Sequence, residues 1–344
     1  MIAERLTAQL LAGAPAEDPV EVTQRLLAIQ AQDPRGARLA IRARSSTASS
    51  AEVDRALTDE RSLLITWLNR GTLHLIGSED YAWLHALTTP PLRTANARRL
   101  AQEGVTPRAA ERGVAVIERT LAEQGPATRA QLRQALDAGG IRTEGQALIH
   151  LLVLASLRGL IVRGPMIGGE QAHVLVSDWL QGGPRFDRDR ALAELARRYL
   201  AGHGPADDRD LARWSGLGLR DARAGLRAIA HELEQRPDGL LDLLRRQPAA
   251  KLPPPRLLGA FDPVLLGWRS REPLLGGHRG LVTVNGLFRP FALVHGRAVA
   301  TWRFSGAEVS LMPLQALTAS QSAALRADAR ALVRYLGLET ITSS

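Results

Sequence analysis

Stretches with apolar residues at helical spacing, broken by glycine and proline, fill most of the chain before residue 250. One arrangement occurs twice. The segment Leu121–Ala127 (LAEQGPA) returns 79 residues further on as Leu200–Ala206 (LAGHGPA), and each copy follows a helical pattern. Glycine followed by proline is expected to end that helix. The repeat therefore predicts two copies of one supersecondary unit.

Each copy continues with two more helical patterns. The predicted helices are Arg129–Ala138 and Glu144–Arg158 in the first copy, and Asp208–Ser215 and Leu219–Leu233 in the second. Strands are predicted at Leu160–Arg163 and Ala172–Val176, around a glycine-rich turn, and more briefly at Leu240–Leu244. Three helices followed by a hairpin is the winged-helix layout.

The first hundred residues fit the same layout, and the last hundred do not. Near the N-terminus the predicted helices are Ile2–Ala12, Pro19–Gln30, Arg35–Arg44 and Ser50–Leu57. An alternating pattern then predicts a hairpin of Leu63–Trp67 and Thr72–Ile76 across Asn69-Arg70-Gly71. After Leu252 the predicted strands are Leu281–Val284, Phe291–Val294 and Ala298–Trp302, and a helix, Ala319–Leu336, closes the chain.

The sequence therefore predicts an α+β protein of three tandem winged-helix units and a β-rich C-terminal segment. The predicted divisions are residues 1–100, 108–180, 186–250 and 251–344. With 344 residues, of which 45% are hydrophobic, the chain is long enough for several folded domains.

The charge of the chain favours an anionic partner. Lys and Arg number 44 against 35 Asp and Glu, a formal charge of +9, and residues 251–344 carry +6 of it. This excess is compatible with a DNA-facing C-terminal segment and equally with a solvated basic surface produced by a GC-rich coding sequence. Lys251 is the only lysine, and Leu252 follows it, so a P-loop is excluded.

Several kinds of catalytic site are excluded by residue type. Without cysteine the chain has no thiolate zinc site, iron–sulfur cluster or cysteine nucleophile. Its eight histidines show no metal-binding spacing, and no Gly-x-Ser-x-Gly motif occurs. No apolar run is long enough to span a membrane, so we expect a cytoplasmic protein that is not associated with membranes.

The most unusual segment holds two glutamines, Gln30 and Gln32, just before Asp33-Pro34. On a helix, residues two apart point in nearly opposite directions, so only one amide would face a site. Pro34 disfavours helix at Asp33, and the helix is therefore expected to end near Gln30, where an extended or turned backbone lets both amides converge. Ordinary capping or solvation of the glutamines is the alternative by pattern alone, and Asp33 is expected mainly to set the turn.

Three motifs in this order resemble the AlkZ-type DNA glycosylases, the winged-helix family of bacterial alkylpurine and interstrand-crosslink glycosylases. They are Gln30-Ala31-Gln32 after LLAI, Trp67–Leu75 (WLNRGTLHL) and Leu258–Arg269 (LGAFDPVLLGWR). The likeness covers roughly residues 1–340. It implies that the winged helices form a C shape around DNA and that Gln30 and Gln32 are catalytic. Some relatives have Gln-x-Asp instead.

The implied chemistry suits such mild residues. A purine alkylated at N7 or N3 is already cationic and leaves as a neutral base, so no strong general acid is needed. An amide oxygen can position water and stabilise the developing sugar cation. The resemblance thus implies a monofunctional glycosylase acting on alkylated purines, in DNA repair or self-resistance, with bulky adducts and interstrand crosslinks as further substrates. It implies no metal and no cofactor. A single lysine argues against a Schiff-base lyase step.

Other side chains are candidates for DNA or lesion contact, each with a structural alternative. They are Arg35, Arg38, Trp67, Asn69, Arg70, His74, Arg269 and Arg271. In strand alternation Trp67 and Asn69 share a face, and their alternative role is packing of a wing on the core. For the arginines the alternatives are ion pairs on a helix surface and a solvated loop.

A different class of protein fits part of this pattern. A non-catalytic winged-helix DNA-binding protein, such as a transcription regulator, would show the same tandem units and positive charge. Regulators usually dimerise to read two half-sites, whereas three different units in one chain can surround DNA as a monomer. We expect a monomer whose partner is double-stranded DNA containing alkylated bases.

Overall fold

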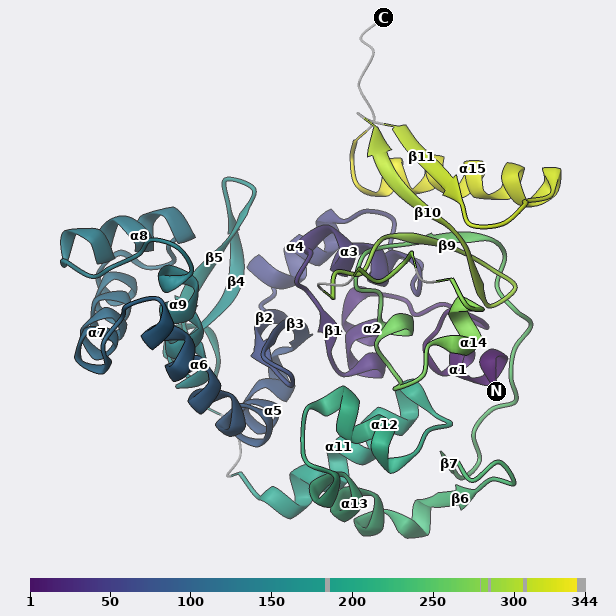
Figure 1. Ribbon diagram of the computed structural model, residues 1–344, viewed down its shortest axis with the longest axis horizontal. Coiled ribbons are helices and arrows are strands. Elements are labelled where there is room, and N and C mark those ends of the chain that lie inside the picture. Colours follow the sequence, from purple (N-terminus) through teal and green to yellow (C-terminus); the bar gives the residue numbers. More distant parts are fainter. Residues whose placement is uncertain (183–185, 279, 284–285, 306–307, 339–344) are drawn as a thin grey trace, which may run out of the picture. The chain divides into compact units, whose positions relative to one another are not determined.

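A computed structural model describes residues 1–182, 186–278, 280–283, 286–305 and 308–338 (Figure 1). The chain forms two compact units. Unit 1 combines Met1–Val53 with Leu192–Ser344, and unit 2 is Asp54–Ala191. Because one unit is built from both ends of the chain, the N-terminal helices belong with the C-terminal sheet. The predicted division into four segments stays a prediction.

The N-terminal part of unit 1 consists of short elements that end at identifiable residues. They are α1 (Ile2–Ala8), α2 (Pro19–Leu26), β1 (Ile29–Gln30), α3 (Pro34–Arg42) and the first residues of α4 (Ala51–Thr58). Asp18 caps α2 by accepting the Glu21 N–H at 2.8 Å, and Pro19 fits the first helical position. The four predicted helices are confirmed. The first three are shorter at their C-terminal ends, and α4 is shifted by one residue.

The C-terminal part of unit 1 is an antiparallel sheet in the order β11-β10-β9-β8, packed against one long helix. Its elements are β8 (Arg256–Leu258), β9 (Phe291–Val294), β10 (Arg297–Ser305), β11 (Glu308–Pro313) and α15 (Ala319–Tyr335), with the short α14 (Glu272–Leu275) before β9. Leu39 of α3 joins Leu257, Trp302 and Leu332 in one buried cluster. The helix that follows the two glutamines is thus anchored in the core of this sheet.

One strand prediction in this region is wrong. Leu281–Val284 was expected to be a strand, but of its described residues only Val282 forms a bridge, to Phe288, and Val284 lies outside the described residues. The predictions for β9, β10 and α15 are confirmed. The sequence pattern missed β8 and β11, since β8 is only three residues long and β11 has no clean alternation of buried and exposed positions.

Unit 1 also holds the second copy of the repeat. Its elements are α11 (Arg188–His203), of which the last twelve residues belong to unit 1, α12 (Asp208–Ser215), α13 (Leu219–Ala228), β6 (Leu233–Gln235) and β7 (Leu241–Leu243). Ala206 forms a bridge with Leu241, so the segment before α12 lies against the hairpin. Asp207 and Asp210 form a capping box at the start of α12, as expected for a helix that must restart after Gly-Pro.

Unit 2 holds the first copy of the repeat and the hairpin of the second motif. Its strands β2 (Leu63–Leu68), β3 (Thr72–Gly77), β4 (Ile161–Ile167) and β5 (Glu170–Leu175) lie in the order β3-β2-β4-β5. Its helices are most of α4, α5 (Tyr81–Thr88), α6 (Pro90–Gln102), α7 (Pro107–Gln124), α8 (Arg129–Ala138), α9 (Ala147–Leu157) and α10 (Val176–Trp179). Here Ala127 bridges to His173, and Thr128 with Gln131 forms the capping box.

The repeat found in the sequence is therefore a structural repeat as well. In both copies a helix, a bridging alanine, a capped helix, a third helix and a hairpin follow one another in the same order. α8 and α12 have the predicted bounds. The predictions missed α5 and α6, which no repeat or clean apolar face announces.

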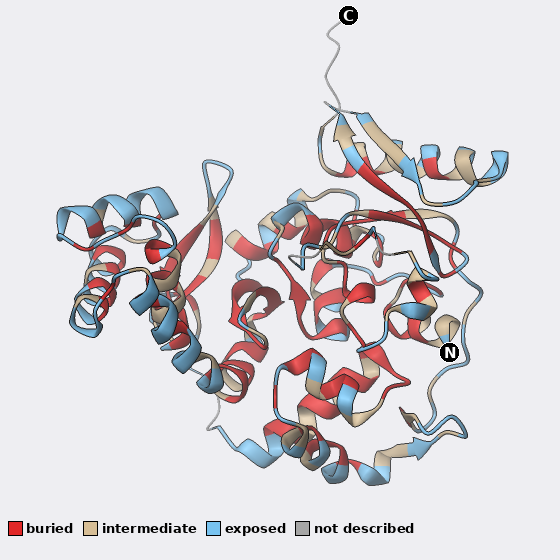
Figure 2. Ribbon diagram, viewed as in Figure 1, coloured by how far each residue is buried: buried red, intermediate tan, exposed pale blue. Residues whose placement is uncertain are grey.

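Burial follows these elements (Figure 2). The hairpin β2–β3 is almost entirely buried, whereas much of α6, α7 and α8 in the same unit is exposed. Among the described helices none is both long and apolar enough to cross a membrane.

Candidate functional site

The two glutamines lie outside any helix. α2 ends at Leu26, because Leu27 adopts a positive φ of 64° and the Ala28 N–H bonds back to the Leu26 carbonyl at 2.8 Å. Gln30 is in the short strand β1, and Gln32 is in the bend that follows. The expectation of an extended or turned backbone at this point is confirmed, although the helix ends four residues earlier than predicted.

The two amides have different environments. Gln30 is 6% exposed, whereas Gln32 is exposed, and Ala31 between them is buried. Both glutamines make polar contacts. Asp33 caps α3, because its Oδ1 accepts the Arg35 N–H at 3.0 Å. The carboxylate thus sets the turn, as expected.

Close contact between two glycines fixes the start of α3. A Cβ atom on Gly36 would lie well inside van der Waals contact of the Ala260 carbonyl oxygen, and one on Gly259 would lie 2.9 Å from the Gly36 Cα. The helix that follows the Gln-x-Gln segment therefore packs backbone to backbone on the third motif. Motifs 223 residues apart in the sequence, counted from Gly36 to Gly259, meet at this point.

A buried ion pair fixes the other end of α3. Arg44 donates to both carboxylate oxygens of Asp262, at 2.9 and 2.7 Å, and both side chains are fully buried. Gln9 accepts a further hydrogen bond from Arg44 at 3.0 Å. Asp262 also accepts the Val264 N–H at 3.0 Å. Asp262 thus accepts a backbone N–H in its own turn, and its main partner is Arg44.

The arginines of α3 are spread over different environments. Arg35 is exposed, with its guanidinium carbon 4.8 Å from the centre of the Phe304 ring. Arg38 is 8% exposed and donates to the Pro34 carbonyl at 2.9 Å. Arg42 forms an ion pair with Asp328 at 2.6 Å. Of these candidates Arg35 is the most accessible to a phosphate group.

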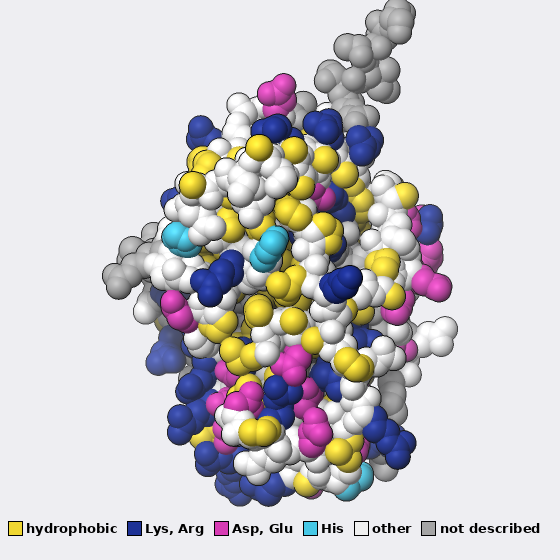
Figure 3. Space-filling model, turned by 90° about the vertical axis from the view of Figure 1, so that its right-hand side faces the viewer, with side chains coloured by type: hydrophobic (Ala, Val, Ile, Leu, Met, Phe, Trp, Pro, Cys, Tyr) yellow, Lys and Arg dark blue, Asp and Glu magenta, His cyan; other side chains and the backbone are white. Residues whose placement is uncertain are grey.

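The two candidates after Trp268 have different partners. The Arg269 side chain is half-exposed, 4.0 Å from Asp210. Arg271 donates from Nε to the Leu265 carbonyl at 2.7 Å and lies over the Phe288 ring, and burial lowers the pKa of its guanidinium. On the face of the molecule that Figure 3 shows, basic side chains gather along the lower left edge and are mixed with acidic and apolar side chains elsewhere.

In unit 2 the second motif forms the predicted hairpin. The Gly71 N–H donates to the Leu68 carbonyl at 2.9 Å, and Asn69 and Gly71 have φ values of 52° and 81°. β2 ends at Leu68, so the expectation that Trp67 and Asn69 share a strand face is wrong, because Asn69 is already in the turn. The Asn69 side chain is 1% exposed, and neither amide atom has a hydrogen-bond partner among the described residues.

His74 on β3 is buried and neutral. Its exposed fraction is 2%, its Nδ1 lies 2.9 Å from the Thr72 carbonyl, and burial lowers the pKa of the imidazole to about 3. At neutral pH this side chain is therefore a hydrogen-bonding group rather than a cation.

One cluster in unit 2 was not found from the sequence. Arg163 on β4 donates from Nε to the Nε2 of His173 at 3.2 Å, and its guanidinium carbon lies 4.8 Å from the centre of the Trp67 ring. Arg163 is partly buried, and no carboxylate pairs with it among the described residues. The signal was weak, because a single arginine in a strand pattern is common. Only the structure shows that the neighbours of Arg163 are the uncharged side chains of His173 and Trp67.

A metal site is not found in the described part of the chain: no three His, Asp or Glu side chains there are arranged to hold an ion.

Comparison with known proteins now decides the family. Residues 23–335 match the family model described as DNA glycosylase AlkZ-like. The chain belongs to the AlkZ-like DNA glycosylase family. The resemblance carried by the three motifs is thereby confirmed.

Both the curated match and the solved structure that resemble this AlkZ-like glycosylase come from Streptomyces sahachiroi. A protein named interstrand DNA cross-link repair glycosylase is 28% identical over 339 residues, covering 91% of this chain and 89% of the relative. The solved structure of DNA glycosylase AlkZ matches with a TM-score of 0.75 at 24% identity, over 98% of this chain and 96% of that one. The AlkZ-like chain thus has the AlkZ fold, a mixed α and β architecture.

Proposed function

We propose that the protein is a monofunctional glycosylase that hydrolyses the N-glycosidic bond of purines alkylated at N7 or N3, and that Gln30 and Gln32 carry the reaction. The arrangement of the two glutamines is the main support. A buried amide and an exposed amide lie two residues apart on non-helical backbone, directly before the capped start of α3. Family membership supports an enzyme over a non-catalytic regulator.

In the proposed reaction water adds to C1′ of the sugar, the C1′–N bond breaks, and its electron pair neutralises the departing cationic base. The proton that the water loses passes to solvent. One amide oxygen accepts a hydrogen bond from the attacking water, and the other lies near the electron-poor sugar. We assign Asp33 no role as a base. Its carboxylate caps α3 by accepting the Arg35 N–H. We assign no lyase step, metal or cofactor.

The substrate class extends to larger lesions in this proposal. The relative at 28% identity is named for interstrand crosslink repair, and a crosslink through purine N7 has the same weakened glycosidic bond as a simple alkylpurine. We therefore propose double-stranded DNA with alkylated or crosslinked purines as the substrate of a monomeric enzyme that works in the cytoplasm, at the nucleoid.

DNA contact is proposed for the remaining candidates. They are Arg35, Arg38, Trp67, Asn69, Arg70, His74, Arg269 and Arg271, to which we add Arg163. Asn69 is the strongest of the uncharged ones, because a buried amide without partners is costly unless a ligand group completes its hydrogen bonds. The proposal includes three winged-helix units curved around the DNA. The bridges at Ala127 and Ala206 support two of them, since each adds the first strand of such a unit.

The decisive experiment is single-turnover release of 7-methylguanine from a defined duplex by the wild type, by Q30A and Q32A separately, and by the double variant. We expect the double variant to lose at least about 100-fold in rate, as is usual when preorganised polar groups are removed from a site. Duplex binding should persist. Gln247→Ala, an exposed glutamine elsewhere in unit 1, is the control and should keep the wild-type rate.

The outcomes separate the parts of the proposal. Release that survives in the double variant would overturn the role of the two glutamines. If neither 7-methylguanine nor a crosslinked purine is released by the wild type, the proposed substrate class is wrong.

A further inference from the structure

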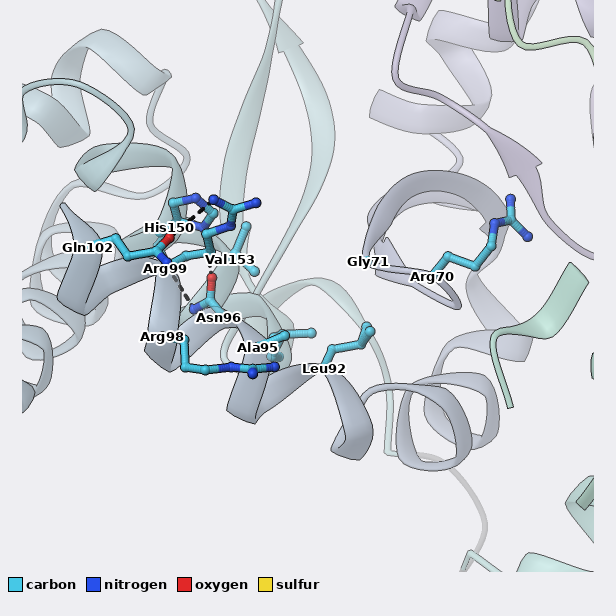
Figure 4. Close-up of a pocket in the computed structure, with 11 residues that line it drawn as sticks. Arg70, Gly71, Leu92, Ala95, Asn96, Arg98, Arg99, Gln102, His150 and Val153 are labelled. Carbon is cyan, nitrogen blue, oxygen red and sulfur yellow. Dashed lines mark hydrogen bonds between the residues drawn. The ribbon is translucent and has the colours of Figure 1, made fainter. Parts of the chain in front are cut away.

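Unit 2 contains a cavity of about 630 Å³ beside the turn of the second motif (Figure 4). It is lined by residues of that turn, of α6 and of α9: Arg70, Gly71, Leu92, Ala95, Asn96, Arg98, Arg99, Gln102, His150, Val153 and Leu157. Figure 4 shows Arg70 and Gly71 on one side of the space and the α6 and α9 side chains on the other.

The lining is cationic without any carboxylate. Three arginines contribute to it, and no Asp or Glu does. Arg98 has no ion pair with any described residue, and Arg99 donates from Nη1 to the neutral Gln102 at 3.1 Å. Both arginines are exposed, on the same face of unit 2 as the cavity. Such a surface attracts an anion and offers it paired guanidinium donors.

The rest of the lining is ordered and uncharged. Asn96 donates to the His150 carbonyl at 3.0 Å, and its Oδ1 lies 2.9 Å from the His150 Nδ1, so these side chains hold each other in place. Leu92, Val153 and Leu157 add apolar surface. An extended chain that alternates phosphate and deoxyribose presents charge to the arginines and carbon atoms to this surface.

We propose that this cavity binds the phosphodiester backbone of one DNA strand, with Arg98 and Arg99 on successive phosphates. The inference rests on the proposed function, which supplies the DNA. From Leu92 to Gln102 the helix rises about 15 Å, a length over which one strand of B-DNA carries about four phosphates. A strand that runs along α6 therefore meets both arginines. We name this surface the α6 strand site, defined by Ala95, Arg98 and Arg99.

The test is the salt dependence of binding to an undamaged duplex, measured by fluorescence anisotropy. R98Q/R99Q should make the slope of log K against log salt less steep by about 1.8, because each phosphate contact contributes about 0.9. The matched control is R112Q/R119Q, which removes the same charge from exposed positions of α7 in the same unit. The control should change the slope by much less, and the melting temperatures of both should match the wild type.

A second pair of variants tests position rather than total charge. Ala95 lines the cavity, whereas Ala97, two residues along the same exposed helix, does not. A95E should weaken duplex binding by roughly fivefold at low salt, the effect of one like-charge contact near a surface. A97E carries the same charge and should bind nearly as the wild type does.

Equal slopes for R98Q/R99Q and its control would overturn the α6 strand site, and so would equal binding by A95E and A97E. If inorganic phosphate competes at the concentration of duplex, the cavity binds a free anion. If an acidic peptide binds in preference to duplex, the cavity binds a protein partner. Either result would also overturn the α6 strand site. Failure of the proposed function would give a different result from failure of the α6 strand site. In that case the wild type itself would release no damaged base or would not bind the duplex.

Discussion

The two copies of the repeat share one layout, but their surroundings differ. In the first copy Glu123 and Gln124 are exposed at the end of α7. Their counterparts in the second copy, Gly202 and His203, are buried. A Cβ on Gly202 would collide with the carbonyl oxygen of Arg25 at the end of α2, and one on Gly267 would lie 2.8 Å from the His203 ring. The same helix end is thus a solvated surface in one copy and an internal contact in the other.

Aromatic packing and hairpin length extend this contrast. His203 stacks on Tyr199, with ring centres 5.0 Å apart, and Trp268 of the third motif donates to the His203 carbonyl at 2.8 Å. The hairpin of the second copy has strands of three residues each, whereas β4 and β5 in the first have seven and six. The second copy is therefore part of the support for the segment that bears the glutamines, whereas the first keeps a longer hairpin and exposed helices.

The largest expected effect comes from giving the second copy a side chain at its tightest contact. Gly202→Ala should lower the free energy of unfolding by about 3 kcal/mol, because a methyl group there meets backbone that cannot move cheaply. An ordinary Gly→Ala change within a helix would instead stabilise by about 1 kcal/mol. Denaturant unfolding measures the difference.

The matched control is the equivalent position of the first copy. Glu123→Ala should change the free energy of unfolding by less than about 0.5 kcal/mol, as is usual for an exposed helical site. If Gly202→Ala proves as stable as Glu123→Ala, the contact between α11 and α2 is not a support for the glutamine segment.

The contrast also shows how far the sequence could go. The bounds of α8 and α12 follow from Gly-Pro, a capping box and the apolar pattern, which are all local signals. The early end of α2 does not, because no residue type near Leu27 announces its positive φ. α6 was missed because its two buried residues, Asn96 and Leu100, leave the rest of the helix exposed and without an apolar face.

As with the fold, only the local features of the candidate site could be predicted from the sequence. Two glutamines before Asp-Pro pointed to non-helical backbone, and the structure agrees. The contact between Gly36 and Gly259 could not be predicted, since two glycines so far apart in the sequence carry no signal that they meet. The unpaired Asn69 amide was also unpredictable, because it follows from burial by neighbours that no local pattern specifies.

A smaller effect concerns acid stability of the second copy. Burial lowers the pKa of His203 from 6.5 to about 3, so above pH 6.5 both folded and unfolded states are neutral at this ring. Below that pH the unfolded state binds the proton and the folded state does not, and stability falls. From pH 7 to pH 5 the loss due to His203 is about 2 kcal/mol.

Replacing this residue by its counterpart sharpens the comparison. Gln124 is the residue of the first copy that corresponds to His203. His203→Gln therefore gives both copies a glutamine at this position and removes the titrating ring. We expect a lower but flatter stability curve between pH 7 and pH 5, measured by urea unfolding at each pH. Parallel curves for the wild type and the variant would show that His203 is not the group that titrates.

The smallest effect on stability is expected at Arg163, where the first copy differs from the second in chemistry rather than packing. Its neutral partner His173 occupies the place of Leu241, as the bridges to Ala127 and Ala206 show. A partly buried guanidinium without a carboxylate is costly, and the Trp67 ring offsets only part of that cost. A DNA phosphate would complete its pairing. Arg163→Gln should therefore make the salt dependence of duplex binding less steep by about 0.9.

A purely structural role would give the opposite pattern. If Arg163 serves only to hold Trp67 and His173, the Gln variant loses thermal stability and keeps the wild-type salt slope. Arg163→Lys separates the two roles further, because lysine keeps the charge but not the planar donors that reach His173 Nε2 and lie over the Trp67 ring. If lysine restores the salt slope but not the melting temperature, Arg163 contacts a phosphate. The second copy of the repeat has Leu241 in place of His173 and therefore no equivalent of this contact.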